Sequence, residues 1–186
     1  LREDVHALGA LVGETLRDQG GEDFFKLVEG DRLAAIRRRV GGVGDGAELQ
    51  QRTMGRTPSA AMDLTRAFSL WFQAVNTAEK VHRVRRRRQY LNDSSTSQPG
   101  GIGDCIAHLK RDGVSLDQAL DLIAAMSIEP VFTGHPTEST RRTILRKQQN
   151  IAHDLLERRN PALTPAELDT LWSRVRLQIT SIWQTE

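Results

Sequence analysis

Apolar residues recur at steps of three and four positions along most of this 186-residue chain, and this spacing constrains the fold more than any other feature. Such spacing places apolar side chains on one face of an α-helix. The clearest examples run over 1–19, 24–39, 58–90 and 164–186. The best strand candidate is the short β-prone run Pro130–Thr133, which lies between a Pro and a Gly. The sequence therefore predicts a mostly α-helical protein.

Glycine, proline and polar residues divide this pattern into separate helices. The glycine pair at 20–21 breaks the first helical pattern, and the segment 41–57 is predicted to be a loop because it holds few large apolar residues. Pro58 opens the longest predicted helix, since proline suits the first helical position. We expect this helix to end near Tyr90, before the polar run 92–103.

Two capping boxes predict where later helices begin. In a capping box, a Ser or Thr and a Glu or Gln three positions later satisfy each other's backbone donors. Ser115 with Gln118, and Thr164 with Glu167, have this spacing. We therefore expect one helix from Ser115 to about Met126 and another that begins after Thr164. A further short helix is predicted over about 102–111.

The overall composition is that of a globular chain. Residues of the class AVILMFWYC make up 38% of the sequence, and exchanging the single Tyr for the 15 Gly in this class gives roughly 46%. This lies in the usual globular range of about 45 to 50%, which excludes a disordered chain. No apolar run approaches the roughly 20 residues that a membrane-spanning helix needs, and no secretory leader opens the chain. Cys105 is the single cysteine, so it cannot form an internal disulfide. We therefore expect a cytoplasmic protein without a membrane partner.

The 26 Lys and Arg residues nearly balance the 24 Asp and Glu residues, so net charge does not indicate nucleic-acid binding. The arginines are nevertheless clustered, at 37–39, at 83 with 85–88, and at 141–142. The cluster at 83–88 is interpreted as cations near a helix C-terminus that pair with acidic groups. The alternative is a helical binding module that uses these clusters on nucleic acid or acidic partners.

The segment Val131–Arg142 carries the strongest functional signal, because it reads as a strand, a Gly, a His, a Pro and a helix. A strand that ends just before a helix presents its last side chain where α/β enzymes keep their active sites. His135 is that side chain, and imidazole can exchange protons at neutral pH. We predict a following helix over about 137–158, whose first amides favour a bound anion.

Two other interpretations of this segment remain open. His135 could simply cap the helix, without a chemical role. The spacing of His135 and Glu138 could suggest a metal pair, but two ligands without a third make a poor site. No metal is therefore assigned to this chain.

The stretch Thr133–Arg142 also resembles the histidine signature of the phosphoenolpyruvate carboxylases, which usually reads Thr-Ala-His-Pro-Thr, then Glu or Gln, and later Arg with a basic residue. Gly134 replaces the usual Ala, which loosens the backbone beside His135 without blocking the site. The opening Leu-Arg-Glu-Asp-Val and the segments 76–88 and 178–186 are similar to further landmarks of the family, in the same order.

The resemblance implies a fold and a domain organisation. Members of the family are mostly helical enzymes built on a (β/α)8 barrel. The chain would then be an N-terminal portion, with a helical region over 1–129. Residues 130–186 would hold the first barrel strand, at about 131–134, and the helices that follow it in an incomplete barrel. Both ends lie within helical patterns, which agrees with a piece of a longer protein.

The resemblance also implies an activity. The family forms oxaloacetate and phosphate from phosphoenolpyruvate and bicarbonate with Mg²⁺ or Mn²⁺, whose ligands would lie beyond residue 186. His135 would assist the breakdown of carboxyphosphate, while Arg141 and Arg142 are candidates to bind an anion such as phosphate or a sugar-phosphate effector. A homotetramer under allosteric control is expected by resemblance, and the 186-residue chain alone is expected to be inactive.

Overall fold

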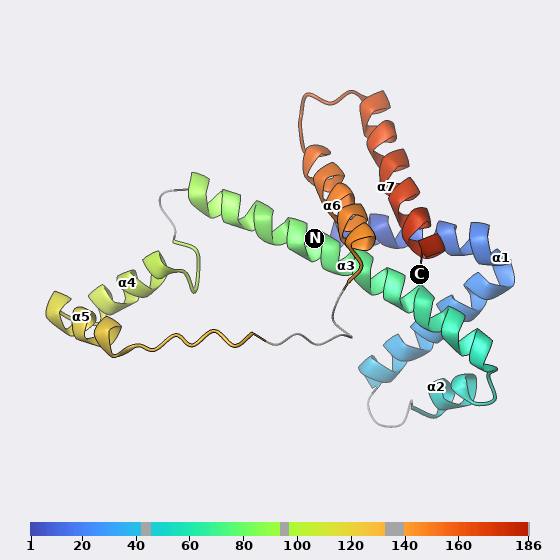
Figure 1. The fold of residues 1–186 in the computed structure, drawn as a ribbon, viewed down its shortest axis with the longest axis horizontal. Helices are drawn as coiled ribbons and strands as arrows, with labels where there is room; N and C mark the ends of the chain where they lie inside the picture. Colours follow the sequence, from blue (N-terminus) through green and yellow to red (C-terminus); the bar gives the residue numbers. More distant parts are fainter. Residues whose placement is uncertain (42–45, 94–96, 133–139, 186) are drawn as a thin grey trace. The chain divides into compact units, whose positions relative to one another are not determined.

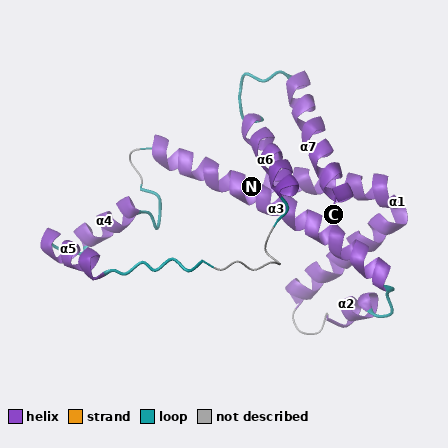
Figure 2. Cartoon of the chain, viewed as in Figure 1, coloured by secondary structure: helices purple, strands orange, loops and turns teal. Residues whose placement is uncertain are grey.

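The computed structural model describes residues 1–41, 46–93, 97–132 and 140–185 (Figure 1). These residues form helices and loops but no strand (Figure 2). The helices are α1 (Arg2–Gly41), α2 (Gly46–Thr53), α3 (Pro58–Asn92), α4 (Ile102–Arg111), α5 (Leu116–Ala125), α6 (Arg142–Glu157) and α7 (Pro165–Thr185). The prediction of a mostly helical chain is therefore confirmed.

Helix α1 is broken at Gly21, as the sequence predicted. This residue has φ 83° and ψ 167°, which lies outside the helical region and is accessible mainly to glycine. The kink divides α1 into a first arm, from Arg2 to Gly20, and a second arm, from Glu22 to Gly41. The two arms therefore run in different directions (Figure 1).

The prediction of a loop throughout 41–57 is wrong, because α2 occupies Gly46–Thr53. The segment holds few large apolar residues, but Ala, Glu, Leu, Gln and Arg dominate Gly46–Thr53, and all of these favour helix. Two ion pairs attach α2 to the second arm of α1. Arg37 Nη2 lies 2.5 Å from Glu48 Oε1, and Arg52 Nε lies 2.8 Å from Asp31 Oδ1.

Both predicted capping boxes are present. Ser115 Oγ accepts from the Gln118 amide at 3.2 Å, and Gln118 Oε1 accepts from the Ser115 amide at 2.9 Å. Thr164 and Glu167 make the equivalent pair at 3.4 Å and 2.8 Å. The helices α5 and α7 therefore begin where the sequence predicted.

The predicted barrel strand at about 131–134 is not confirmed. Val131 and Phe132 lie outside any strand, and their side chains are 82% and 93% exposed. The other two positions lie outside the described residues. A strand needs a neighbouring strand to pair its backbone groups, and the described ranges of the chain contain none.

The chain divides into two compact units. The first, called here the core unit, comprises 1–81 and 141–186, and the second, the hairpin unit, comprises 82–140. Helix α3 belongs to the core unit up to Val81 and to the hairpin unit from His82 onward. The predicted domain boundary between 129 and 130 stays a prediction.

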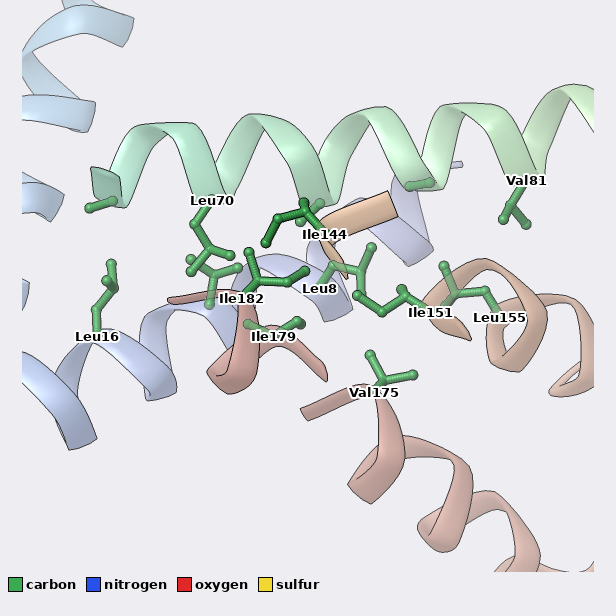
Figure 3. Packing of buried hydrophobic residues seen from close by; sticks show 14 of the residues in the cluster. Leu8, Leu16, Leu70, Val81, Ile144, Ile151, Leu155, Val175, Ile179 and Ile182 are labelled. Carbon is green, nitrogen blue, oxygen red and sulfur yellow. The ribbon is translucent and has the colours of Figure 1, made fainter. Parts of the chain in front are cut away.

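The core unit buries one apolar cluster from α1, α3, α6 and α7 (Figure 3). On α1 and α7 its members lie at apolar positions that the helical periodicity predicted. On α3 the predicted positions Phe68, Trp71 and Val75 are only partly buried, and the neighbouring positions Leu70 and Ala74 are buried in their place. The buried residues of the cluster are Leu8, Val12, Leu16, Val28, Ala67, Leu70, Ala74, Ala78, Val81, Ile144, Ile151, Leu155, Val175, Ile179 and Ile182.

The hairpin unit contains α4 and α5 and leaves most of its large apolar side chains exposed. Leu116, Leu120 and Ile123 of α5 have relative exposures of 74%, 53% and 64%, and they share one helical face. No helix in the described part of the chain combines the length and the hydropathy needed to cross a bilayer.

Candidate functional site

The segment that carries the predicted catalytic histidine lies outside the described residues. It comprises 133–139 and includes both Gly134 and His135. The role predicted for His135 therefore stays a prediction. The described residues nearest to His135 in the sequence lie at the start of α6.

The structure places Arg141 and Arg142 differently from the sequence prediction. Both were expected about one turn inside a helix that begins near 137, but α6 begins at Arg142. Arg141 occupies the N-cap position with φ −55° and ψ 138°. This backbone conformation is not helical, so the helix does not extend to residues before Arg142. The two guanidinium groups thus extend from the first residues of α6 and not from its second turn.

Arg141 is attached to the C-terminal end of α7. Its Nη1 donates to the carbonyl oxygen of Thr185 at 3.4 Å. Arg142 is also exposed, but the described residues offer it no hydrogen bond or ion pair. Of the two predicted anion ligands, Arg142 is therefore the one whose charge is not engaged by the part of the chain that the structure describes.

Lys147 makes a second attachment at the same end of α7. Its Nζ donates to the Ser181 carbonyl oxygen at 2.9 Å, to Ser181 Oγ at 2.6 Å and to Thr185 Oγ1 at 2.8 Å. A cation near the last carbonyl groups of a helix satisfies unpaired acceptors and interacts favourably with the helix dipole. Sequence reasoning missed Lys147, because its partners lie 34 and 38 positions away and no local pattern marks them.

The rest of α6 is fixed by burial and by one ion pair. Ile144, Ile151 and Leu155 are 1%, 2% and 0% exposed within the apolar cluster. Arg174 of α7 holds the buried carboxylate of Asp154 with Nη2–Oδ1 and Nε–Oδ2 distances of 2.5 Å and 3.3 Å. This bidentate contact raises the pKa of the Arg174 guanidinium through its hydrogen bond with Asp154. Burial and this ion pair therefore hold helix α6, and with it the helix start at Arg142, in position against the core.

The electrostatics at this helix start favour an anion. The first turn of α6 contains no acidic residue, and the N-cap side chain makes no capping hydrogen bond. The first amides of a helix lack intrahelical partners and carry the positive end of the dipole. Arg142 is the first residue of this helix, and a guanidinium group is a common partner of phosphate and carboxylate.

The second arginine cluster, at 83–88, lies on α3 one turn before its end. Because α3 continues to Asn92, its last turn contains no basic residue, and the expected interaction with the helix C-terminus is not made there. Arg86 instead contacts Tyr90, with Nη2 2.5 Å from Oη and the guanidinium 5.2 Å from the ring centroid.

The described residues do not fit a divalent metal. No group of three or more His, Cys, Asp or Glu side chains in the described ranges could hold such an ion. The Mg²⁺ or Mn²⁺ that the sequence resemblance implies is therefore not placed on these residues.

Comparison with known proteins extends the resemblance over the whole chain. A family model described as phosphoenolpyruvate carboxylase matches residues 1–186. A phosphoenolpyruvate carboxylase of Xanthomonas campestris pv. campestris (strain 8004) is 44% identical over 186 residues, which is 100% of this chain and 20% of that protein.

More distant relatives align over the same length. The phosphoenolpyruvate carboxylases of Nocardia farcinica and Acinetobacter baumannii are 36% and 35% identical, over 100% of this chain and 20% and 21% of their own lengths. The chain thus spans about one-fifth of the length of the curated relatives that it matches. Since the family match covers every residue from 1 to 186, the chain belongs to the phosphoenolpyruvate carboxylase family.

Proposed function

We propose that this chain is the N-terminal part of a phosphoenolpyruvate carboxylase, a lyase that forms oxaloacetate and phosphate from phosphoenolpyruvate and bicarbonate. The observation that carries the proposal is the family match over residues 1–186, which includes the histidine signature at Thr133–Arg142. The 186-residue chain is inactive alone under this proposal. The cytoplasmic location, the homotetramer and the allosteric control that the resemblance implies are parts of the same proposal.

His135 acts as a general base in the proposed reaction. Phosphoryl transfer to bicarbonate gives carboxyphosphate and the enolate of pyruvate. A neutral imidazole takes the carboxyl proton of carboxyphosphate, which then separates into CO₂ and phosphate. The enolate attacks this CO₂ and becomes oxaloacetate. General acid or base catalysis of this kind contributes about 10²- to 10⁴-fold to a rate.

Arg141 and Arg142 have different roles in this proposal. Arg142 holds the phosphate released near His135, because it stands at the start of α6, where the first amides and the helix dipole favour an anion. Arg141 positions the segment that leads into α6, because its guanidinium contacts the Thr185 carbonyl oxygen of α7. A sugar-phosphate effector is a second anion that the same pair would suit.

The substitution His135→Asn tests the base in the full-length protein that carries this sequence. We expect oxaloacetate formation to fall by at least about 10²-fold, because Asn keeps a polar group but cannot accept the proton. Phosphoenolpyruvate consumption continues slowly and yields pyruvate, since the enolate is protonated when no CO₂ is delivered. Oxaloacetate and pyruvate are measured together in each reaction.

His153→Asn is the matched control, because His153 lies on α6 with an exposed side chain. It should keep the oxaloacetate rate of the parent protein. Normal oxaloacetate turnover by the His135→Asn protein would show that His135 is not the base of the reaction.

The substitution Arg142→Gln tests the anion site in the same full-length protein. We expect a loss of about 1.5–3 kcal/mol in transition-state stabilisation, the usual contribution of a hydrogen bond to a charged group. Arg146→Gln, one turn further along α6 and also exposed, is the matched control. Steady-state kinetics with varied phosphoenolpyruvate measure both. Equal losses in the two variants would argue against a specific role for Arg142.

A further inference from the structure

A half-open cavity lies within residues 1–81, between the two arms of α1 and helix α3. Its volume is about 500 Å³, within the range of roughly 300–1,000 Å³ that is usual for small-molecule sites. The interior gap beside Leu70 and Ile179, by contrast, is about 10 Å³ and holds no ligand of that size. The cavity between the arms of α1 and helix α3 is therefore a candidate binding site.

Three aromatic side chains, Phe25, Phe68 and Trp71, line this cavity. Gly9 and Gly13 lie one turn apart on the first arm of α1, next to Trp71 and Phe25 respectively. A side chain at Gly9 would collide with the Trp71 indole, and a Cβ at Gly13 would lie 3.2 Å from Phe25 Cε2. The absence of side chains at the two glycines thus lets the rings of Trp71 and Phe25 pack closely on the first arm of α1, and both rings line the cavity. Aromatic side chains in the lining suit a planar apolar group.

The charged residues of the lining give it an excess of positive charge. Three arginines line the cavity, against one carboxylate, that of Glu29. Glu29 pairs with Arg32 through Oε1–Nη2 and Oε2–Nε distances of 2.6 Å and 2.7 Å. Arg17 lies 3.7 Å above the Phe25 ring and 3.3 Å from Glu22 Oε2.

Arg2 remains as the rim cation that no described carboxylate engages. The imidazole of His6 lies on the same rim, one turn further along the first arm of α1. An anionic group at this edge would therefore complement the cavity better than a cation would.

We propose that this cavity binds an aromatic carboxylate. The ring lies against the aromatic lining residues Trp71 and Phe68, and the carboxylate meets Arg2 at the rim. The cavity is lined by none of the residues assigned to the carboxylase reaction. A negative result for binding at this cavity would therefore leave the proposed carboxylase function untouched, and the reverse also holds.

Binding is tested with 2-naphthoate on the full-length protein that carries this sequence, by titration with ligand-observed NMR. A ligand this small gains little binding free energy, so we expect a Kd of about 1 mM. Ala10→Phe fills the space from an exposed lining position and should abolish saturable binding. Ala35→Phe, which is exposed on the same helix but outside the lining, should leave the Kd unchanged.

The charge assignment is tested separately. Arg2→Gln should weaken 2-naphthoate binding by about two- to fivefold, as expected for one exposed ion pair. Arg39→Gln, an exposed arginine of α1 outside the lining, is its control. The neutral amide of the same ring, 2-naphthamide, should bind more weakly than the carboxylate. Absence of saturable binding, equal binding of the amide, or unchanged binding after Ala10→Phe would overturn the proposal.

Discussion

The core unit and the hairpin unit use the same sequence pattern with opposite results. In both, apolar residues repeat at helical spacing, but the core unit buries them and the hairpin unit leaves them exposed. Leu155 of α6 is 0% exposed, whereas Leu120 of α5 is 53% exposed. Periodicity therefore fixes which face of a helix is apolar, while burial depends on what packs against that face.

The largest effect expected from this comparison is on stability. Leu155→Ala should lower the free energy of unfolding by about 2–5 kcal/mol, because it leaves a cavity in the core. Leu120→Ala removes the same atoms from an exposed site and should change stability by less than about 0.5 kcal/mol. Urea unfolding followed by circular dichroism measures both. Equal losses would mean that the hairpin unit is as closely packed as the core unit.

A second, smaller effect concerns the carboxylate that attaches α2 to α1. Burial raises the pKa of Asp31, but hydrogen bonds from Arg56 and Arg52 outweigh it and lower the pKa below its ordinary value. The lowered pKa means that this stabilisation is complete above the unfolded pKa of about 3.9 and is lost as pH falls through the folded value.

Asp31→Asn should therefore lower the free energy of unfolding at pH 7 by about 1–3 kcal/mol and reduce the decline in stability between pH 5 and pH 3. The measurement is the urea midpoint at each pH. Asp23→Asn, at an exposed position of the same arm of α1, should keep the parent's decline. An unchanged pH dependence in Asp31→Asn would show that other carboxylates produce the acid sensitivity.

Substitutions in the hairpin unit are expected to have the smallest effect on stability. Their main effect is expected on the binding of an apolar dye to the exposed face of α5. An apolar face of this kind should bind the dye anilinonaphthalene sulfonate. The double substitution of Leu120→Gln with Ile123→Gln should reduce dye fluorescence while changing stability by less than about 0.5 kcal/mol for each site. Leu177→Gln, at an exposed position of α7, is the control and should reduce the fluorescence less.

Local signals predicted much of the fold. The capping box at Ser115 and the proline at 58 located two helix starts because each acts within one turn of the chain. The kink at Gly21 was predictable for the same reason. Helix α2 was missed because large apolar residues were taken as the mark of a helix, although its ion pairs with α1 hold it in place.

The candidate site was less predictable. The motif around His135 indicated the family and its chemistry, but it did not locate the start of α6. That start follows the extended conformation of Arg141, whose side chain contacts a residue 44 positions away. Lys147 depends likewise on α7. Such contacts form only when the helices pack together, so the spacing of residues within the motif cannot predict them.

The kink at Gly21 also sets how the chain tolerates changes in length. A residue inserted within one arm of α1 rotates every later side chain of that arm by about 100° around its axis. Because Gly21 leaves the helical conformation, this rotation need not pass from one arm to the other. The rotation of each arm about its own axis is thus set separately. An insertion or deletion in one arm therefore need not displace both Leu8, in the first arm, and Val28, in the second arm, from the core.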